Sequence, residues 1–333
     1  MPNSRENAIR FLETQWSSIN ANKVIGIQAE VRFENHLNTP ALRSLYQFII
    51  PGGWIISPGN INLTNLPTKN RIAVLPIPKA FTWSGAISPP SFSGQVLAHS
   101  YFQQAGMKVY FAECDTILNA VNEGNFAIPT KGSYLRSYNI NFKKVGAQGL
   151  VPVPTAVVMN NFSPRMGARG MRAYALHRID RTLPIWNDNH IVTDLFWKDY
   201  VRYFLQRNFV VSNNDLDFFL VSNSGKSYPV EFKSKTAAND TQIGDWFGID
   251  VGPFAKLSYF ISLSNNMDAI YVVEEVDALR NTVDWWAIKF SDLLKGCSWV
   301  QQGGGAGMGG GRSSTLKVPK AVFTQLNIFL TTI

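Results

Sequence analysis

Hydrophobic positions in the first fifty residues change their spacing along the chain. Over residues 3–20 they recur every three or four positions, which predicts an amphipathic helix with Asn3 and Glu6 at capping-box spacing. Over residues 25–33 they alternate with polar residues, which is the period of a half-buried strand. A second helix is expected over residues 40–48, because proline is well tolerated in a first helical turn.

Residues 51–160 are interrupted by proline and glycine pairs such as Pro58-Gly59 and Pro89-Pro90. Short strands and loops are therefore expected there. The clearest regular segments are a helix near residues 94–104 and a strand over residues 108–112.

The pattern becomes more regular after about residue 190. We expect a helix, a two-stranded hairpin, a helix, two strands and a closing helix, in that order, over residues 194–206, 216–222, 227–232, 253–263, 269–274, 285–290 and 319–330. This order predicts an α/β fold in which helices flank a mixed β-sheet. Residues 1–190 are expected to form a larger α+β part.

Composition indicates a globular core and an anionic partner. The chain has 333 residues, of which 45% are hydrophobic, too many for a disordered protein. Lysine and arginine number 31 against 23 acids, a net charge of +8, which favours nucleic acid as a partner. Residues 1–191 hold 18 basic and 9 acidic residues (+9), and the remainder holds 13 and 14 (−1). This asymmetry is typical of a protein that binds a polyanion with one part and concentrates acids in another.

Cysteine content and hydropathy exclude several classes of protein. Only Cys114 and Cys297 occur, so one chain cannot build a disulfide framework or a four-thiolate zinc site. The sequence begins without an apolar signal segment, and no stretch reaches the roughly 20 apolar residues of a membrane helix. The sequence therefore predicts a soluble protein of the cytoplasm.

The predicted hairpin brings acidic residues together. Asn223-Ser224-Gly225 suits a three-residue hairpin loop, with glycine at the position that needs a positive φ. Pairing about Ser224 places Asp217 opposite Glu231, and Lys233 lies on the same face two residues further on. Asp215 is an alternative first acid, although strand parity favours Asp217.

Two opposed carboxylates repel each other unless a cation lies between them. Oxygen ligands from Asp217, Glu231 and a backbone carbonyl suit Mg²⁺, which keeps several water molecules and accepts phosphate oxygens. Lys233 beside them could orient or deprotonate an attacking water and offset phosphate charge. The hairpin thus predicts a magnesium site for phosphodiester chemistry.

Asp217, thirteen intervening residues, and Glu231-Phe232-Lys233 resemble the motif of the PD-(D/E)XK nuclease superfamily, which includes most type II restriction endonucleases. Asn214-Asp215-Leu216-Asp217 stands in place of the family's Pro-Asp. The resemblance covers residues 193–333 in outline, where the predicted elements follow the order of the family core. It implies a catalytic domain over residues 191–333 and leaves residues 1–190 as a basic DNA-recognition part.

Carried over by position, the resemblance implies that Asp217, Glu231 and the carbonyl of Phe232 hold Mg²⁺. It implies that Lys233 positions the water that attacks a DNA phosphodiester, with 5′-phosphate and 3′-hydroxyl products. The function implied is that of a prokaryotic, sequence-specific endonuclease on double-stranded DNA. A homodimer would match the symmetry of a palindromic site.

Basic residues outside the motif are candidates for DNA contacts. A loop rich in proline and glycine carries Arg165, Arg169 and Arg172, whose planar guanidinium groups suit phosphate or a guanine edge. Lys235 and Lys256 are expected where the strand end and the following helix meet the DNA backbone. Solvated basic side chains are the alternative for each of these residues.

Other interpretations of the same residues stay open. The fold type also serves structure-selective and repair nucleases, and a DNA-binding protein without catalysis would keep the acids as a remnant. The hairpin charges could also form only a surface salt bridge. Gly305-Ala306-Gly307-Met308-Gly309-Gly310 matches a dinucleotide-binding pattern but leaves only 23 residues for the rest of such a domain.

Overall fold

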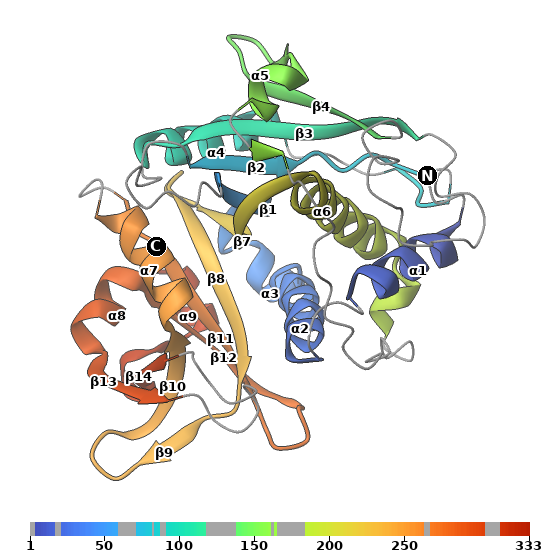
Figure 1. Ribbon diagram of the computed structural model, residues 1–333. Helices are drawn as coiled ribbons and strands as arrows, with labels where there is room; N and C mark the ends of the chain where they lie inside the picture. The colour runs from blue at the N-terminus through green and yellow to red at the C-terminus, as the bar shows by residue number, and fades with distance from the viewer. Residues whose placement is uncertain are drawn as a thin grey trace. The chain divides into compact units, whose positions relative to one another are not determined.

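The chain is mixed α/β and divides into two compact units (Figure 1). Unit 1 comprises residues 1–28 and 51–216, and unit 2 comprises residues 29–50 and 217–333. The computed structural model describes residues 4–16, 21–58, 71–81, 83–86, 91–117, 138–160, 163–164, 184–262, 267–303 and 314–333. The bounds of the units differ from those of the two parts expected from the sequence, because residues 29–50 belong to unit 2 and residues 191–216 belong to unit 1. The functional division at residue 190 stays a prediction.

Unit 1 holds a mixed sheet and several helices. Its strands follow the order β1-β2-β3-β4-β5, in which β2 and β3 are parallel and the other neighbours are antiparallel. The elements of this unit are α1 (Arg5–Trp16), β2 (Ile72–Pro76), α4 (Phe92–Gln104), β3 (Lys108–Ile117), β4 (Tyr138–Val145), β5 (Leu150–Val153), α5 (Thr155–Met159), β6 (Ser163–Pro164), η3 (Pro184–Asn187) and α6 (Asn189–Asn208), with the second part of β1 (Tyr46–Pro58) and the first part of β7 (Phe209–Ser222). The helix predicted near 94–104 and the strand predicted over 108–112 are confirmed.

Unit 2 holds further strands of the mixed sheet and a smaller antiparallel sheet. Its mixed-sheet strands follow the order β7-β8-β11-β12-β15, in which β8 and β11 are parallel, and the smaller sheet has the order β13-β14-β10-β9. The elements are α3 (Pro40–Arg43), β8 (Ser227–Lys235), β9 (Ala238–Asp240), β10 (Gly244–Asp250), α7 (Val251–Ile261), β11 (Ile270–Val276), β12 (Thr282–Lys289), α8 (Phe290–Gly296), β13 (Ser298–Gly303), β14 (Ser314–Pro319), η5 (Lys320–Val322), β15 (Thr324–Gln325) and α9 (Leu326–Leu330), with the second half of α2 (Ala21–Leu37). The predicted order of helix, hairpin, helix and strand is observed, with β9 and β10 inserted before α7.

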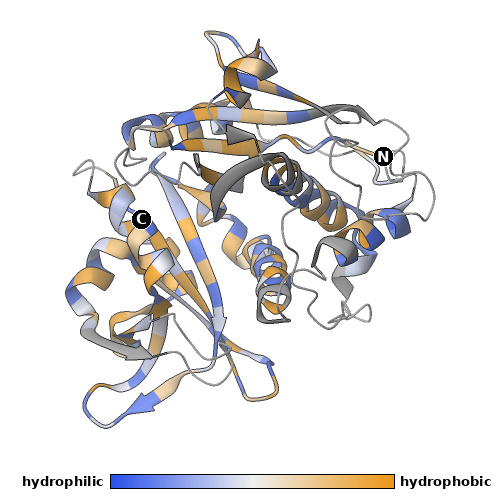
Figure 2. Ribbon diagram, in the orientation of Figure 1, coloured by the Kyte–Doolittle hydropathy of each residue, from blue (hydrophilic) through white to orange (hydrophobic). Residues whose placement is uncertain are grey.

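Alternation along β8 separates an apolar face from a polar one, whereas β7 carries buried hydrophobic residues on both faces, Phe219 among them. Hydrophobic and hydrophilic residues alternate along β8 (Figure 2). Phe218, Val230 and Phe232 belong to a buried cluster that includes Phe33 of α2, whose ring stacks on Phe232 at 4.8 Å between centroids. Asp217 and Glu231 have the opposite parity, so they leave the strands on the other face. The apolar face therefore anchors the hairpin and leaves its acids on the opposite side.

Residues 25–33 form a helix, so the strand predicted there is wrong. The region lies within α2, where Ala29, Phe33 and Leu37 are all buried at a spacing of four residues. The same residues satisfy both a period of two and a helical period, and packing against the apolar face of the sheet selects the helix.

Other expected helices change length or type. The first runs from Arg5 to Trp16, and its Ser4 Oγ accepts a hydrogen bond from Asn7 N. The helix expected over 40–48 ends at Arg43, and β1 begins at Tyr46. The closing helix expected over 319–330 is reduced to α9, because buried Phe323 packs on Phe247 in an extended stretch. Among the described residues, no helix has both the length and the apolar character required to cross a membrane.

Candidate functional site

The β7–β8 hairpin sets the position of the two acids. Its loop contains Gly225 at φ +82°, and the strands pair Val221 with Ser227 and Phe218 with Val230. These pairs are symmetric about Ser224, as the sequence predicts, and one further step places Asp217 opposite Glu231. The side chain of Asp217 reaches β8, because its Oδ2 accepts a hydrogen bond from Phe232 N at 2.7 Å.

Asp215 lies two residues before Asp217 on the same strand. In a regular strand both side chains leave on one face, so parity alone does not distinguish them. The register and the hydrogen bond to Phe232 N do, and both select Asp217 as the acid beside Glu231.

Glu231 is the centre of the cluster. Its side chain is 2% exposed, and each carboxylate oxygen contacts a lysine ammonium. Lys233 Nζ lies 2.6 Å from Oε1, and Lys256 Nζ lies 2.5 Å from Oε2. An unpaired carboxylate at this depth would be strongly unfavourable, so the two ammonium groups offset the cost of burying it.

The two lysines come from different elements. Lys233 follows Glu231 on β8, is 32% exposed, and also donates to the carbonyl oxygen of Phe232 at 3.0 Å. Lys256 lies on α7, and its side chain is only 9% exposed. The structure therefore places Lys256 inside the acidic cluster, a different position from the DNA-backbone contact expected from the sequence. Its contribution to DNA binding stays a prediction.

Lys235 and Tyr271 complete the polar face of the sheet. Lys235 Nζ lies 3.8 Å from the position that a Cβ on Gly248 would occupy, so this side chain approaches β10. Burial lowers the pKa of Lys235; Asp250 opposes this shift and Lys233 adds to it. Tyr271 pairs with Glu231 across β8 and β11 and donates its hydroxyl to Gly248 O at 2.8 Å. Burial raises the pKa of Tyr271, so the phenol stays protonated.

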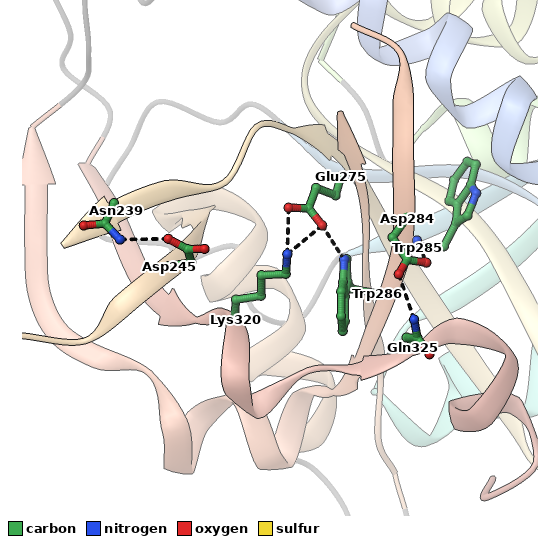
Figure 3. Close-up of polar contacts among 8 residues, drawn as sticks. All are labelled: Asn239, Asp245, Glu275, Asp284, Trp285, Trp286, Lys320 and Gln325. Atoms are coloured by element: carbon green, nitrogen blue, oxygen red, sulfur yellow. Dashed lines mark hydrogen bonds and ion pairs between the residues drawn. The ribbon is translucent and has the colours of Figure 1, made fainter. Parts of the chain in front are cut away.

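A separate polar cluster of unit 2 provides a structural comparison (Figure 3). Glu275 of β11 is 8% exposed, and its carboxylate accepts hydrogen bonds from Lys320 Nζ and Trp286 Nε1, all at 2.8 Å. Nearby, Asp284 accepts from Gln325 Nε2 at 2.8 Å. Lys320 also lies over the Trp286 ring, 4.8 Å from its centroid. Here one lysine ammonium and one indole N–H hold a buried acid that lies opposite Asp284 on β12.

The donor set of the hairpin fits a hard divalent cation. Asp217 and Glu231 supply carboxylate oxygens and Phe232 a carbonyl oxygen, and such ligands suit Mg²⁺ with water or phosphate in the other positions. The described residues contain no cluster of three or more Asp, Glu, His or Cys side chains able to hold a metal. The two acids and two lysines of the cluster have a net charge of zero. Because each oxygen of Glu231 contacts a lysine, a cation bound there would meet an ammonium group at either oxygen.

The predicted residues are placed to different extents. Asp217, Glu231, Phe232 and Lys233 are brought together as expected, and their functional roles stay predictions. Arg165, Arg169 and Arg172 lie outside the described residues.

Sequence reasoning missed the contact between Lys256 and Glu231, and it missed Tyr271. The pairing of Lys256 with Glu231 spans 25 positions that include β9 and β10, so no local spacing signals it.

Comparison of the chain with models of protein families, with curated proteins and with solved structures found no match.

Proposed function

We propose that this protein is a Mg²⁺-dependent endonuclease that hydrolyses phosphodiester bonds of double-stranded DNA, in the manner of a type II restriction enzyme. The observation that carries the proposal is the meeting of Asp217, Glu231 and Lys233 on one face of the β7–β8 hairpin. A restriction function places the protein in the cytoplasm of a prokaryote. Cutting both strands of a palindrome is served best by a homodimer.

The burial of two acids on one face of the hairpin supports a functional site. Hydrophobic residues of similar volume would often stabilise such a position as well as a buried ion cluster does. Perturbed and buried charged groups concentrate at functional sites for that reason. Glu231 is 2% exposed at its side chain and shares its face with Asp217, which is 6% exposed. We infer that the chain retains this arrangement for its chemistry.

In the proposed reaction Asp217, Glu231 and the Phe232 carbonyl would hold Mg²⁺. The ion would supply a Lewis acid for the phosphate and a more acidic bound water. Lys233 would orient the attacking water through its ammonium, which already lies 2.6 Å from Glu231 Oε1 and 3.0 Å from Phe232 O. Water would add to phosphorus as the bond from phosphorus to O3′ breaks, which leaves a 5′-phosphate and a 3′-hydroxyl.

A plasmid digest with and without Mg²⁺ tests this proposal. We expect discrete fragments from the wild-type protein with Mg²⁺ and none with EDTA. Glu231→Gln and Lys233→Gln should each reduce the cleavage rate by about 100-fold or more, the usual scale for loss of a group that acts on the reacting water. Full activity in either variant would refute the assigned roles.

Matched controls separate catalysis from folding. Glu275→Gln and Lys320→Gln remove the charges of a different ion pair in unit 2, and we expect both variants to cut DNA. Thermal unfolding of all four variants should show that the inactive ones remain folded. Sequencing the ends of the fragments then identifies the cut position.

One observation favours a second candidate, a DNA-binding protein without catalysis. Both oxygens of Glu231 are paired with lysines, which a purely structural ion cluster would also show. Tight duplex binding that Mg²⁺ and Mn²⁺ leave unchanged, with no cleavage, would favour this candidate. Cleavage of branched but not linear DNA would instead indicate a structure-selective or repair nuclease.

A further inference from the structure

Lys256 holds Glu231 from outside the hairpin. Its ammonium lies 2.5 Å from Glu231 Oε2, and its side chain is 9% exposed, whereas Lys233 on the other oxygen is 32% exposed. Lys256 also lies on α7, which follows β10, so the contact joins α7 to the polar face of the sheet. Lys256 is therefore the more deeply buried cation of the cluster.

A divalent cation and an ammonium group compete for one carboxylate. The charges of Asp217, Glu231, Lys233 and Lys256 sum to zero without a metal, and a bound Mg²⁺ would raise this sum to +2. Like charges a few ångströms apart in a partly buried site repel strongly, because water screens them poorly there. A metal on Glu231 therefore either displaces the Lys256 ammonium or binds against its repulsion.

We propose that Lys256 is a resident counter-ion of Glu231. Its ammonium pairs with the Oε2 atom of Glu231 and thereby weakens the binding of a divalent cation at that carboxylate. The proposal rests on the metal site of the proposed function. It adds a residue of α7 to that site and assigns it a role in setting metal affinity. Lys233 differs, because its ammonium also contacts the Phe232 carbonyl and lies closer to solvent.

Calorimetric titration of Mn²⁺ into the full-length protein without DNA tests the proposal by binding alone. Removing the charge in Lys256→Gln should tighten Mn²⁺ binding by about tenfold, because a nearby positive charge is lost. Lys256→Arg keeps the charge and should bind Mn²⁺ about as weakly as the wild type does. Lys320→Gln removes the lysine that pairs with Glu275 of β11, away from Glu231, and should change the affinity by less than about twofold.

Each other result overturns the counter-ion role. Equal or weaker Mn²⁺ binding in Lys256→Gln would refute it and leave the metal site intact. Absence of Mn²⁺ binding in both proteins would refute it together with the metal site of the proposed function. An unchanged Mn²⁺ affinity in Glu231→Gln would show that Mn²⁺ binds at another site and would also refute the counter-ion role. If Lys256→Gln does not fold, Lys256→Met keeps the apolar stem, removes the charge and carries the same expectation.

Discussion

Two glutamates buried in the mixed sheet of unit 2 are neutralised by different chemistry. Glu274, fully buried, receives both arms of the Arg32 guanidinium at 3.0 and 2.9 Å and a hydroxyl from Thr282 at 2.7 Å. Glu231 is held by two lysine ammonium groups. A guanidinium fork matches a carboxylate in a fixed geometry, whereas an ammonium is a point charge that another cation can replace. The guanidinium partner therefore suits Glu274 to a structural role. The ammonium partners suit Glu231 to a site where a bound cation can replace them.

His36 makes stability depend on pH. Its ring stacks on Trp285 at 4.6 Å, and burial lowers its pKa below the ordinary 6.5, although Asp284 and Glu274 oppose this shift. The folded protein thus favours the neutral ring, so the stabilising contribution is present above pH 6.5 and is lost as pH falls through the lowered pKa. The melting temperature of the wild type should fall more between pH 7.5 and pH 5 than that of His36→Gln.

The matched control for this titration is His190→Gln. His190 is exposed at the start of α6, so this variant makes the same histidine-to-glutamine change away from the Trp285 ring. Parallel curves for the wild type and His36→Gln would contradict the role assigned to burial of His36.

Packing of α2 on the sheet depends on one charged contact as well as on the apolar cluster. Phe33 and Leu37 lie in the buried cluster, and Arg32 spans from α2 to Glu274 on β11. Because the carboxylate has no access to water, loss of Arg32 would leave a charge in the sheet without its main partner.

Arg32→Met should lower the free energy of unfolding by about 3 kcal/mol, the lower end of the range for breaking a buried ion pair, because Arg32 is 34% exposed. Arg32→Lys keeps the charge without the second hydrogen bond and should cost about 1 kcal/mol. Arg10→Met breaks the exposed pair with Glu6 and should cost less than about 0.5 kcal/mol. Urea unfolding measures all three, and a loss in Arg32→Met no larger than in Arg10→Met would contradict the assignment.

Elements whose cause is local are the ones that the sequence predicts well. The loop with Gly225 sets the hairpin register, and that register alone predicts the meeting of Asp217 and Glu231. In α2 the local pattern supports both helix and strand, and only tertiary packing of Ala29 and Phe33 decides between them. The contact of Lys256 with Glu231 depends on where α7 packs, which no residue spacing reports. The part of the site that lies on the hairpin was therefore predictable from the sequence. The counter-ion Lys256, which comes from α7, was not.

At the scale of the whole chain, charge is the property that most constrains the partner. The net charge is +8, because residues 1–191 carry +9 and the remainder carries −1. Contacts between cationic side chains and phosphates release condensed counterions, so the logarithm of the affinity for DNA falls linearly with the logarithm of salt concentration, with a slope of about 0.9 per phosphate contact. A protein that binds duplex DNA through this region must show this dependence of affinity on salt concentration.

The salt dependence of DNA affinity can be measured without cleavage by using Glu231→Gln in EDTA. Duplex binding by this variant is measured over a range of salt concentrations. Replacing Arg165, Arg169 and Arg172 together by alanine should reduce the slope of log affinity against log salt by up to about 3, because each lost phosphate contact removes about 0.9. The control triple, Lys226, Lys289 and Lys295 to alanine, removes the same charge from unit 2 and should leave the slope near that of the parent. If the control triple alone flattens the slope, the DNA lies against unit 2. If the parent shows no salt dependence, duplex DNA is not the partner, because a polyanion cannot be bound through phosphates without releasing its counterions.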